Sequence, residues 1–289
     1  MRKYKLKIEN NILKYYLKNV FFITGTAFAG KSTTVKMLAE KYDMIFCGEN
    51  YHSAVSDIVA TPDAQPDICY LNDLTDWRDF VRRSSEEYER WVFGVGEEAA
   101  EFEVAELLSL SKNNKKIIVD TNIPVDVLKE ISEYNRVAVM LSPQSMSVER
   151  FFDRDDPEKQ FILRVIQSCE NPEAVMENYK RGLALINSKV HYDELANSGF
   201  FTVVRQDDGN DTRKEVCDMI AAHFGLTNSD LSVKPSENAV FSRHFAYLVF
   251  QPYVFSLVFA LTSRNKGKFF TLRRPPYPAV LRKYASLPL

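Results

Sequence analysis

The residues of this 289-residue chain that most clearly indicate a chemical function form a phosphate-binding pattern. Residues 25–32 read GTAFAGKS, which fits the form G-x-x-x-x-G-K-[ST]. Glycines in such a loop allow backbone N–H groups to approach phosphate oxygens, and the helix that follows directs its N-terminus at the same anion. The pattern predicts that Lys31 contacts the β- and γ-phosphates of a nucleoside triphosphate and that the Ser32 hydroxyl ligates Mg²⁺.

The flanking segments match what this loop requires. The apolar run 20–24 precedes it and the helix-forming stretch 31–42 follows it, so an ordinary strand-to-helix turn is the less favoured alternative. We expect nucleotide contacts throughout the loop and the start of the helix, from Gly25, Thr26, Ala27, Phe28, Ala29, Gly30, Lys31, Ser32 and Thr33.

A second chemical feature is the acid at the end of another apolar run. Asp120 closes the strand-like segment 115–120, the position of a Walker-B-type carboxylate that helps to hold Mg²⁺. A helix N-cap or turn aspartate is the alternative. Neither D-x-x-G after Asp120 nor an N-K-x-D guanine-reading motif occurs in the sequence, which disfavours a Ras-like GTPase.

The elements that must position these residues alternate between strand and helix. We expect strands at 20–24, 44–47, 115–120, 136–141 and 200–204. We expect helices at 31–42, 76–111 (with a break near 94–96), 124–134, 146–152, 160–169, 172–188 and 212–224, and a turn-rich loop at 53–75. This alternation predicts a three-layer α/β fold around a mostly parallel five-stranded sheet, with ligands at the carboxyl ends of the strands.

Charge divides the chain into three segments. Residues 1–19 hold six Lys/Arg and one acid, and we expect a basic arm or an edge strand there. Residues 20–226 form the expected nucleotide-binding domain, and 227–289 an irregular hydrophobic C-terminal extension. Residues 20–228 carry 22 Lys/Arg against 36 Asp/Glu, which argues against a general nucleic-acid surface.

The spacing of the cysteines and the composition of the N-terminal segment indicate the expected cellular compartment. Cys47, Cys69, Cys169 and Cys217 are widely spaced and none forms a C-x-x-C pair, which favours a reducing compartment. None of the four histidines pairs with a cysteine at metal-ligand spacing, which disfavours zinc. Cys47 and Cys217 lie in apolar contexts and are expected in the core. The basic start has no apolar run followed by small residues, which disfavours a secretory signal, so the expected location is the cytoplasm.

The C-terminal extension contains nineteen consecutive uncharged residues, 245–263. That length is enough to span a bilayer, but Gln251-Pro252 interrupts it and basic residues flank it on both sides. Three interpretations stay open: a membrane contact, an appendage packed on the domain or a partner, and a poorly ordered extension.

Residues 19–226 resemble the P-loop small-molecule kinases of the shikimate, gluconate and deoxynucleoside kinase group. The loop 25–32 carries the resemblance, and Asp120-Thr121-Asn122 is similar to the Asp-x-Asn stretch of polynucleotide-kinase-type enzymes. The resemblance implies a P-loop NTPase fold with a helical lid, ATP and Mg²⁺ as cofactors, and phosphoryl transfer to the hydroxyl of a small-molecule or nucleotide-like acceptor.

The resemblance also implies roles for individual residues. Arg154 would reach the transferring phosphate from the lid, with Arg150 and Arg164 as further candidates, although surface ion pairs would explain all three. Glu49, directly after the second strand, would orient the acceptor hydroxyl or take its proton, unless it is a solvated turn acid. His52 is a substrate contact or, by the favoured interpretation, a core residue.

Other positions are less specific. Arg78 and Arg82 share a helix face and either grip an anionic acceptor or, as we favour, form surface ion pairs. Trp77 and Trp91 are expected in the core or in a pocket wall. The segment 205–212 matches the family's adenine-contacting loop, in which Thr212 is equally a helix N-cap.

The sequence departs from the family in two places. Asn50 follows Glu49 where deoxynucleoside kinases have proline, and the Gly-rich third strand of shikimate kinases is absent. The acceptor therefore stays unassigned, and a regulatory nucleotide-binding module without a small-molecule acceptor is the alternative function.

Overall fold

A parallel sheet forms the centre of the fold. The computed structural model describes residues 7–72, 74–153, 157–206 and 210–227. Five parallel strands lie in the order β2-β3-β1-β4-β5. Their bounds are β1 Val20–Gly25, β2 Ile45–Cys47, β3 Ile117–Asp120, β4 Val137–Leu141 and β5 Phe201–Val204. The predicted α/β class with a five-stranded parallel sheet is confirmed.

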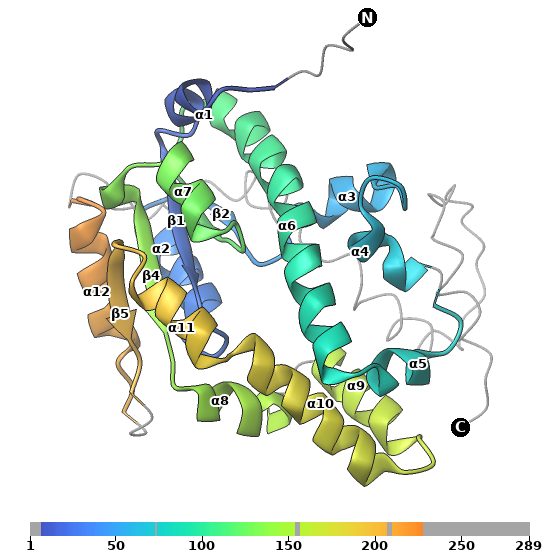
Figure 1. Ribbon diagram of the computed structural model, residues 1–289. Coiled ribbons are helices and arrows are strands. Elements are labelled where there is room, and N and C mark those ends of the chain that lie inside the picture. The colour runs from blue at the N-terminus through green and yellow to red at the C-terminus, as the bar shows by residue number, and fades with distance from the viewer. Residues whose placement is uncertain (1–6, 73, 154–156, 207–209, 228–289) are drawn as a thin grey trace, which may run out of the picture.

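Helices connect the strands and extend the molecule beyond the sheet (Figure 1). Within the described ranges they are α1 Asn10–Tyr16, α2 Lys31–Lys41, α3 Ser53–Val59, α4 Pro66–Cys69, α5 Trp77–Arg82, α6 Ser85–Leu110, α7 Val125–Ile131, α8 Gln144–Glu149, α9 Pro157–Gln167, α10 Pro172–Ile186, α11 Lys189–Ala196 and α12 Arg213–His223. Short 3₁₀ turns lie at Tyr70–Asn72, Ser111–Asn113, Tyr134–Arg136 and Phe151–Asp153.

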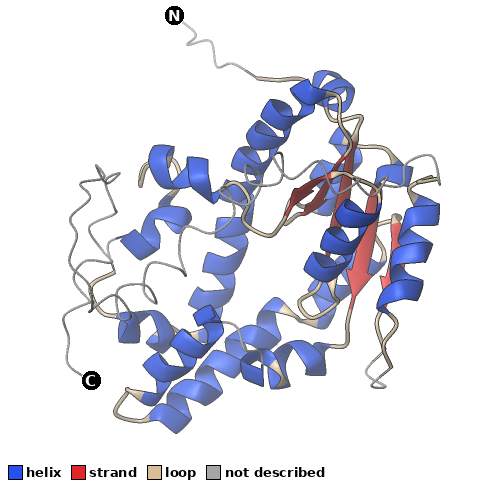
Figure 2. Cartoon of the chain, turned by 180° about the vertical axis from the view of Figure 1, so that it is seen from behind, coloured by secondary structure: helices blue, strands red, loops and turns tan. Residues whose placement is uncertain are grey.

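Strand β1 shows why both faces of the sheet are buried. Phe21 and Ile23 belong to a core cluster with residues of α2 and α12. Val20 and Phe22 belong to a second cluster with residues of α1, α6 and α7. Because successive side chains of a strand point to opposite faces, an unbroken apolar run is what a strand between two helical layers needs. Figure 2 shows the strands enclosed by helices, as the predicted three-layer arrangement requires.

A third apolar cluster lies away from the sheet, in the helical part of the molecule. It joins α5, α9 and α10 through buried side chains that include Phe80, Ile166 and Leu183, and α6 contributes Tyr88 and Trp91. The long helix α6 runs from the sheet to these helices (Figure 1). Among the helices between β4 and β5, α10 packs against α6 and α11 packs against β4.

The structure differs from the expected helix boundaries in the segment 53–111. The predicted turn-rich loop 53–75 contains α3 and α4. The predicted break at 94–96 is wrong, because α6 continues through both glycines there. The break lies at Arg83–Ser84, where the Ser84 hydroxyl accepts from the Glu87 N–H and the Glu87 carboxylate accepts from the Ser84 N–H. This capping box starts a new helix.

A helix lies close to each end of the described part of the chain, α1 near its start and α12 near its end. Residues 10–16 form helix α1, and residues 1–6 of the expected basic arm or edge strand lie outside the described residues. Gly225, with φ +65°, lies directly after the C-cap of α12, a position at which glycine commonly ends a helix. In the described residues, none of the helices has the length and apolar character needed to cross a membrane. The segment 245–263 lies outside the described residues.

Candidate functional site

The phosphate-binding loop joins β1 to α2 and depends on glycine at both ends. Gly25 has φ +135°, and a Cβ there would lie 1.8 Å from the carbonyl oxygen of Met140 on the neighbouring strand β4. Gly30 has φ +94° and stands at the N-cap of α2. Both backbone conformations are ones that L side chains rarely adopt. The conformation of the loop therefore requires glycine at both of these positions.

Two serines that were not anticipated from the sequence brace the loop from the end of β4 and from α8. The Ser142 N–H donates to Thr26 Oγ1 at 2.8 Å, and the Ser142 hydroxyl donates to the Ala27 carbonyl at 2.5 Å. The Ser147 hydroxyl donates to the same carbonyl at 3.1 Å. Ser142 directly follows the predicted fourth strand, and residues that follow parallel strands lie at the edge of the sheet where ligands bind. Its position in the sequence could therefore have indicated that it lies near the loop.

Ser32 and Asp120 meet at the start of α2. The Ser32 hydroxyl donates to Asp120 Oδ2 at 2.6 Å. Asp120 ends β3, which pairs directly with β1 in a register that places it beside Ile23. The side chain of Asp120 is buried, and burial raises its pKa, with the charge of Glu49 adding to the effect. The charge of Lys31 and the hydrogen bond from Ser32 oppose that rise in pKa.

The donor set of this pair fits Mg²⁺. A hydroxyl oxygen and a carboxylate oxygen are hard ligands, and Mg²⁺ in nucleotide sites is typically held by one or two protein groups together with phosphates and water. Lys31, whose Nζ donates to the Thr26 carbonyl at 3.2 Å, supplies a positive charge beside the same loop. Within the described ranges, His, Cys, Asp and Glu side chains form no metal-holding group of three or more.

Glu49 and His52 lie on the turn after β2, beside the end of β3. Glu49 is exposed and is close enough to Asp120 to influence its pKa. His52 is only 5% exposed and its ring stacks on Phe102. Burial lowers the pKa of His52, against the charge of Asp57, and its Nδ1 has no hydrogen-bond partner among the described residues. His52 is therefore a core residue, the interpretation favoured from the sequence.

A cleft of about 380 Å³ lies on the side of the loop toward β4 and β5, whereas Glu49 follows β2 at the other edge of the sheet. The segment after β5 forms one wall of this cleft. The Arg205 guanidinium donates to the Phe28 carbonyl at 2.7 Å, which ties this segment to the phosphate-binding loop. The predicted adenine-contacting segment thus lies beside the loop. The cleft is lined by Ala29, Gly30, Thr33, Thr34, Met140, Val203, Arg205, Asn210, Asp211, Thr212, Arg213 and Val216.

The predicted lid arginines are only partly placed. Arg154 lies outside the described residues. Arg150 follows α8, the helix that Ser147 ties to the loop, and Arg164 is in the last turn of α9. Both Arg150 and Arg164 are exposed.

The arginines and tryptophans singled out in α5 and α6 make mainly structural contacts. Arg78 forms an ion pair with Asp76, the favoured interpretation, and Arg82 is exposed. Trp77 packs edge-on against Phe80, and Trp91 Nε1 donates to the Asp67 carbonyl.

Arg83 was not anticipated from the sequence. Its guanidinium lies 4.4–5.7 Å from the centres of four aromatic rings, those of Tyr70, Phe80, Tyr88 and Trp91. Contacts of this kind between a cation and ring faces are attractive. Burial lowers the pKa of Arg83.

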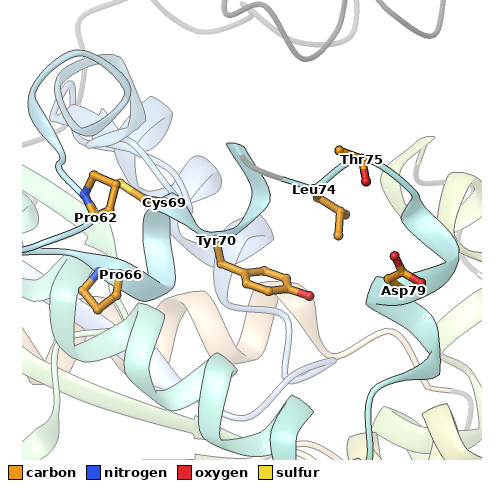
Figure 3. Close-up of a pocket in the computed structure, with 7 residues that line it drawn as sticks. All are labelled: Pro62, Pro66, Cys69, Tyr70, Leu74, Thr75 and Asp79. Carbon is orange, nitrogen blue, oxygen red and sulfur yellow. The ribbon is translucent and has the colours of Figure 1, made fainter.

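Figure 3 shows a second cavity, of about 350 Å³, in the helical part of the molecule. The Tyr70 ring and the Asp79 carboxylate face each other across it. None of the residues predicted for the nucleotide or the metal lines this cavity. The lining comprises Pro62, Pro66, Cys69, Tyr70, Leu74, Thr75 and Asp79.

Glu103, in the middle of α6, was also not anticipated from the sequence. Its side chain is 1% exposed and its carboxylate accepts hydrogen bonds from the Thr121 hydroxyl and the Asn122 N–H. Burial raises the pKa of Glu103 from 4.5 to about 7, and the charge of Asp120 adds to this rise. Nothing in the local sequence around position 103 distinguishes it from the other acids of α6.

The strand order, the loop after β1 and the acid after β3 are consistent with a P-loop NTPase fold. No family model and no curated protein matches the sequence. Among solved structures, the dephospho-CoA kinase from Campylobacter jejuni is similar at a TM-score of 0.35 and 18% identity, over 72% of this chain and 99% of that one.

Proposed function

We propose that this protein is an ATP- and Mg²⁺-dependent phosphotransferase that acts on the hydroxyl of a small-molecule or nucleotide-like acceptor. The observation that carries the proposal is the 2.6 Å hydrogen bond between Ser32 and Asp120 at the start of α2, next to Lys31. It brings a hydroxyl, a carboxylate and an ammonium group to one end of a glycine-shaped loop. This set suits the triphosphate end of a nucleotide.

The chain's own groups have distinct tasks in this proposal. The loop N–H groups and Lys31 hold the β- and γ-phosphates, and Ser32 and Asp120 hold Mg²⁺, which when bound neutralises negative charge on the phosphates. The cleft beside Arg205 takes the nucleoside. Arg154, from the lid, stabilises charge on the transferring phosphoryl group.

Glu49 is the proposed acceptor-side residue. It orients the acceptor hydroxyl, whose oxygen forms the new bond to phosphorus while the bond from phosphorus to the ADP oxygen breaks, and it takes the hydroxyl proton. Its position on the turn after β2, near Asp120, supports this role.

A regulatory nucleotide-binding module is the second candidate, because a phosphate-binding loop and a metal-binding carboxylate are also sufficient for a nucleotide-dependent switch. The discriminating experiment is a screen of candidate acceptors with ATP, in which ADP release is measured above the background without acceptor. Acceptor-dependent ADP release that is lost in Glu49→Gln, while ATP binding is kept, supports the phosphotransferase. Turnover that is unchanged in Glu49→Gln shows that the role given to Glu49 is wrong.

A further inference from the structure

Glu103 forms hydrogen bonds to the two residues immediately after Asp120, the candidate Mg²⁺ ligand. The Thr121 hydroxyl donates to Glu103 Oε2 at 2.5 Å, and the Asn122 N–H donates to Oε1 at 3.2 Å. Thr121 is completely buried and directly follows Asp120. Both oxygens of one carboxylate are thus bonded to the two residues that follow Asp120.

The same turn is fixed from two other directions. The Thr121 N–H donates to the Ile23 carbonyl of β1 at 3.0 Å, and the Thr121 hydroxyl accepts from the Ile123 N–H, also at 3.0 Å. The contact with Glu103 comes from outside the sheet, from helix α6. Without it, the hydrogen bonds of Thr121 given above for the described residues go to β1 and to its own turn.

Glu103 also contacts the turn on the acceptor side. The Tyr51 hydroxyl lies 3.1 Å from the backbone carbonyl oxygen of Glu103 and 3.4 Å from its Oε2. Tyr51 is two residues beyond Glu49. A single position on α6 therefore connects the turn after β2, which carries Glu49, with the turn after β3, which follows Asp120.

A buried carboxyl group is unfavourable unless its oxygens are hydrogen-bonded. The side-chain hydrogen bonds of Glu103 go to these two turns. The bonds that offset the cost of burying this carboxyl group therefore also order the two turns. Groups that orient a metal ligand from behind typically change metal affinity or activity by about 10–100-fold when they are removed.

We propose that Glu103 is a positioning residue of the metal site. Glu103 orients Asp120 through Thr121 and Asn122, and it fixes the position of Asp120 relative to the turn that carries Glu49. The inference rests on the proposed function, because it takes Asp120 as the Mg²⁺ ligand.

The test is the Mg²⁺ dependence of nucleotide binding, which needs no acceptor. Binding of a fluorescent ATP analogue is titrated against Mg²⁺ for the full chain, for Glu103→Ala and Glu103→Gln, and for the control Glu101→Gln, an exposed acid of the same helix. We expect Glu103→Ala to need about tenfold more Mg²⁺ for half-maximal binding. Glu103→Gln, whose amide keeps the size and can bond to both residues, should stay within about threefold of the wild type, and Glu101→Gln should not differ from it.

Folding of each variant is checked by its thermal transition. If Glu103→Ala does not fold, Thr121→Val is the replacement. It keeps a side chain of similar size and removes the hydrogen bond to Glu103 together with the one from the Ile123 N–H, so the Mg²⁺ requirement should rise by at least as much. A folded Glu103→Ala or Thr121→Val variant with the wild-type Mg²⁺ requirement overturns the inference, as does a wild-type chain whose nucleotide binding is independent of Mg²⁺. Mg²⁺-dependent binding without turnover of any acceptor would count against the proposed function alone.

Discussion

The Ser32 hydroxyl lies 2.6 Å from Asp120 Oδ2, although 88 positions separate the two residues in the chain. The contact exists because β3 pairs with β1, so that the residue ending β3 lies beside the loop that follows β1. The hydroxyl at the start of α2 then meets the carboxylate across the edge of the sheet. This pair is the centre of the proposed metal site.

If the pair acts as one metal-binding unit, its two members are energetically coupled. Ser32→Ala and Asp120→Asn should each raise the Mg²⁺ concentration for half-maximal ATP turnover by about tenfold or more. The effect of the double variant should be smaller than the sum of the two single effects by about 0.5–3 kcal/mol, the usual range for groups in contact. Effects on the Mg²⁺ requirement that add fully would mean that the residues act independently.

Lys31 should be required for turnover. Removing a charge that is aimed at the transferring phosphate typically costs about 100-fold or more in rate, so Lys31→Ala should lose at least that much ATP turnover while keeping its thermal stability. Lys36→Ala is the matched control, because Lys36 is an exposed lysine of the same helix α2. Full turnover in Lys31→Ala would refute the central claim of the phosphotransferase proposal.

The shape of the loop should tolerate no side chain at Gly25. A Cβ 1.8 Å from the Met140 carbonyl oxygen, at φ +135°, forces β1 and β4 apart, and we expect Gly25→Ala to lower the free energy of unfolding by about 3 kcal/mol or more. Gly96→Ala is the opposite case. Gly96 lies within α6, and a Cβ added there would meet no atom within 4 Å, so alanine should stabilise by about 0.5–1 kcal/mol. Urea unfolding measures both.

The buried acid Glu103 should make stability depend on pH. Its pKa is raised from 4.5 to about 7, mainly by burial, so the folded protein holds the proton more tightly than the unfolded chain does. The free energy of unfolding therefore falls as pH rises through this range, and the loss is complete above about pH 7. With about 1.4 kcal/mol for each tenfold change in proton affinity, the loss is about 3 kcal/mol.

Glu103→Gln isolates this effect, since it removes the titrating group and leaves the other ionisable groups, including neighbouring Asp120 and Tyr51, in place. Urea unfolding at several pH values should show that wild type loses stability relative to Glu103→Gln between about pH 4.5 and pH 7. A difference between the two proteins that is constant over this range would contradict the pKa shift.

Much of the fold was predictable from local pattern. The apolar runs indicated all five strands because a strand buried on both faces must be apolar along its length, as in 20–24. Helix boundaries were less predictable, because both a capping sequence and a pair of glycines can mark a helix end. Ser84 and Glu87 form a capping box that starts α6, whereas the glycines at 94 and 96 lie inside that helix. Segment 53–75 was predicted as a loop because of its prolines, although it contains two short helices.

The sequence by itself determined where the phosphate-binding loop lies, because Gly25, Gly30, Lys31 and Ser32 fall in one pattern of eight consecutive residues. It also indicated Asp120 from its place at the end of an apolar run. Only the tertiary structure decided which strand lies beside β1, and hence that Asp120 meets Ser32. It alone decided that Glu103 ties the turns after β2 and β3 together, since contacts between distant segments depend on packing, which no local pattern records.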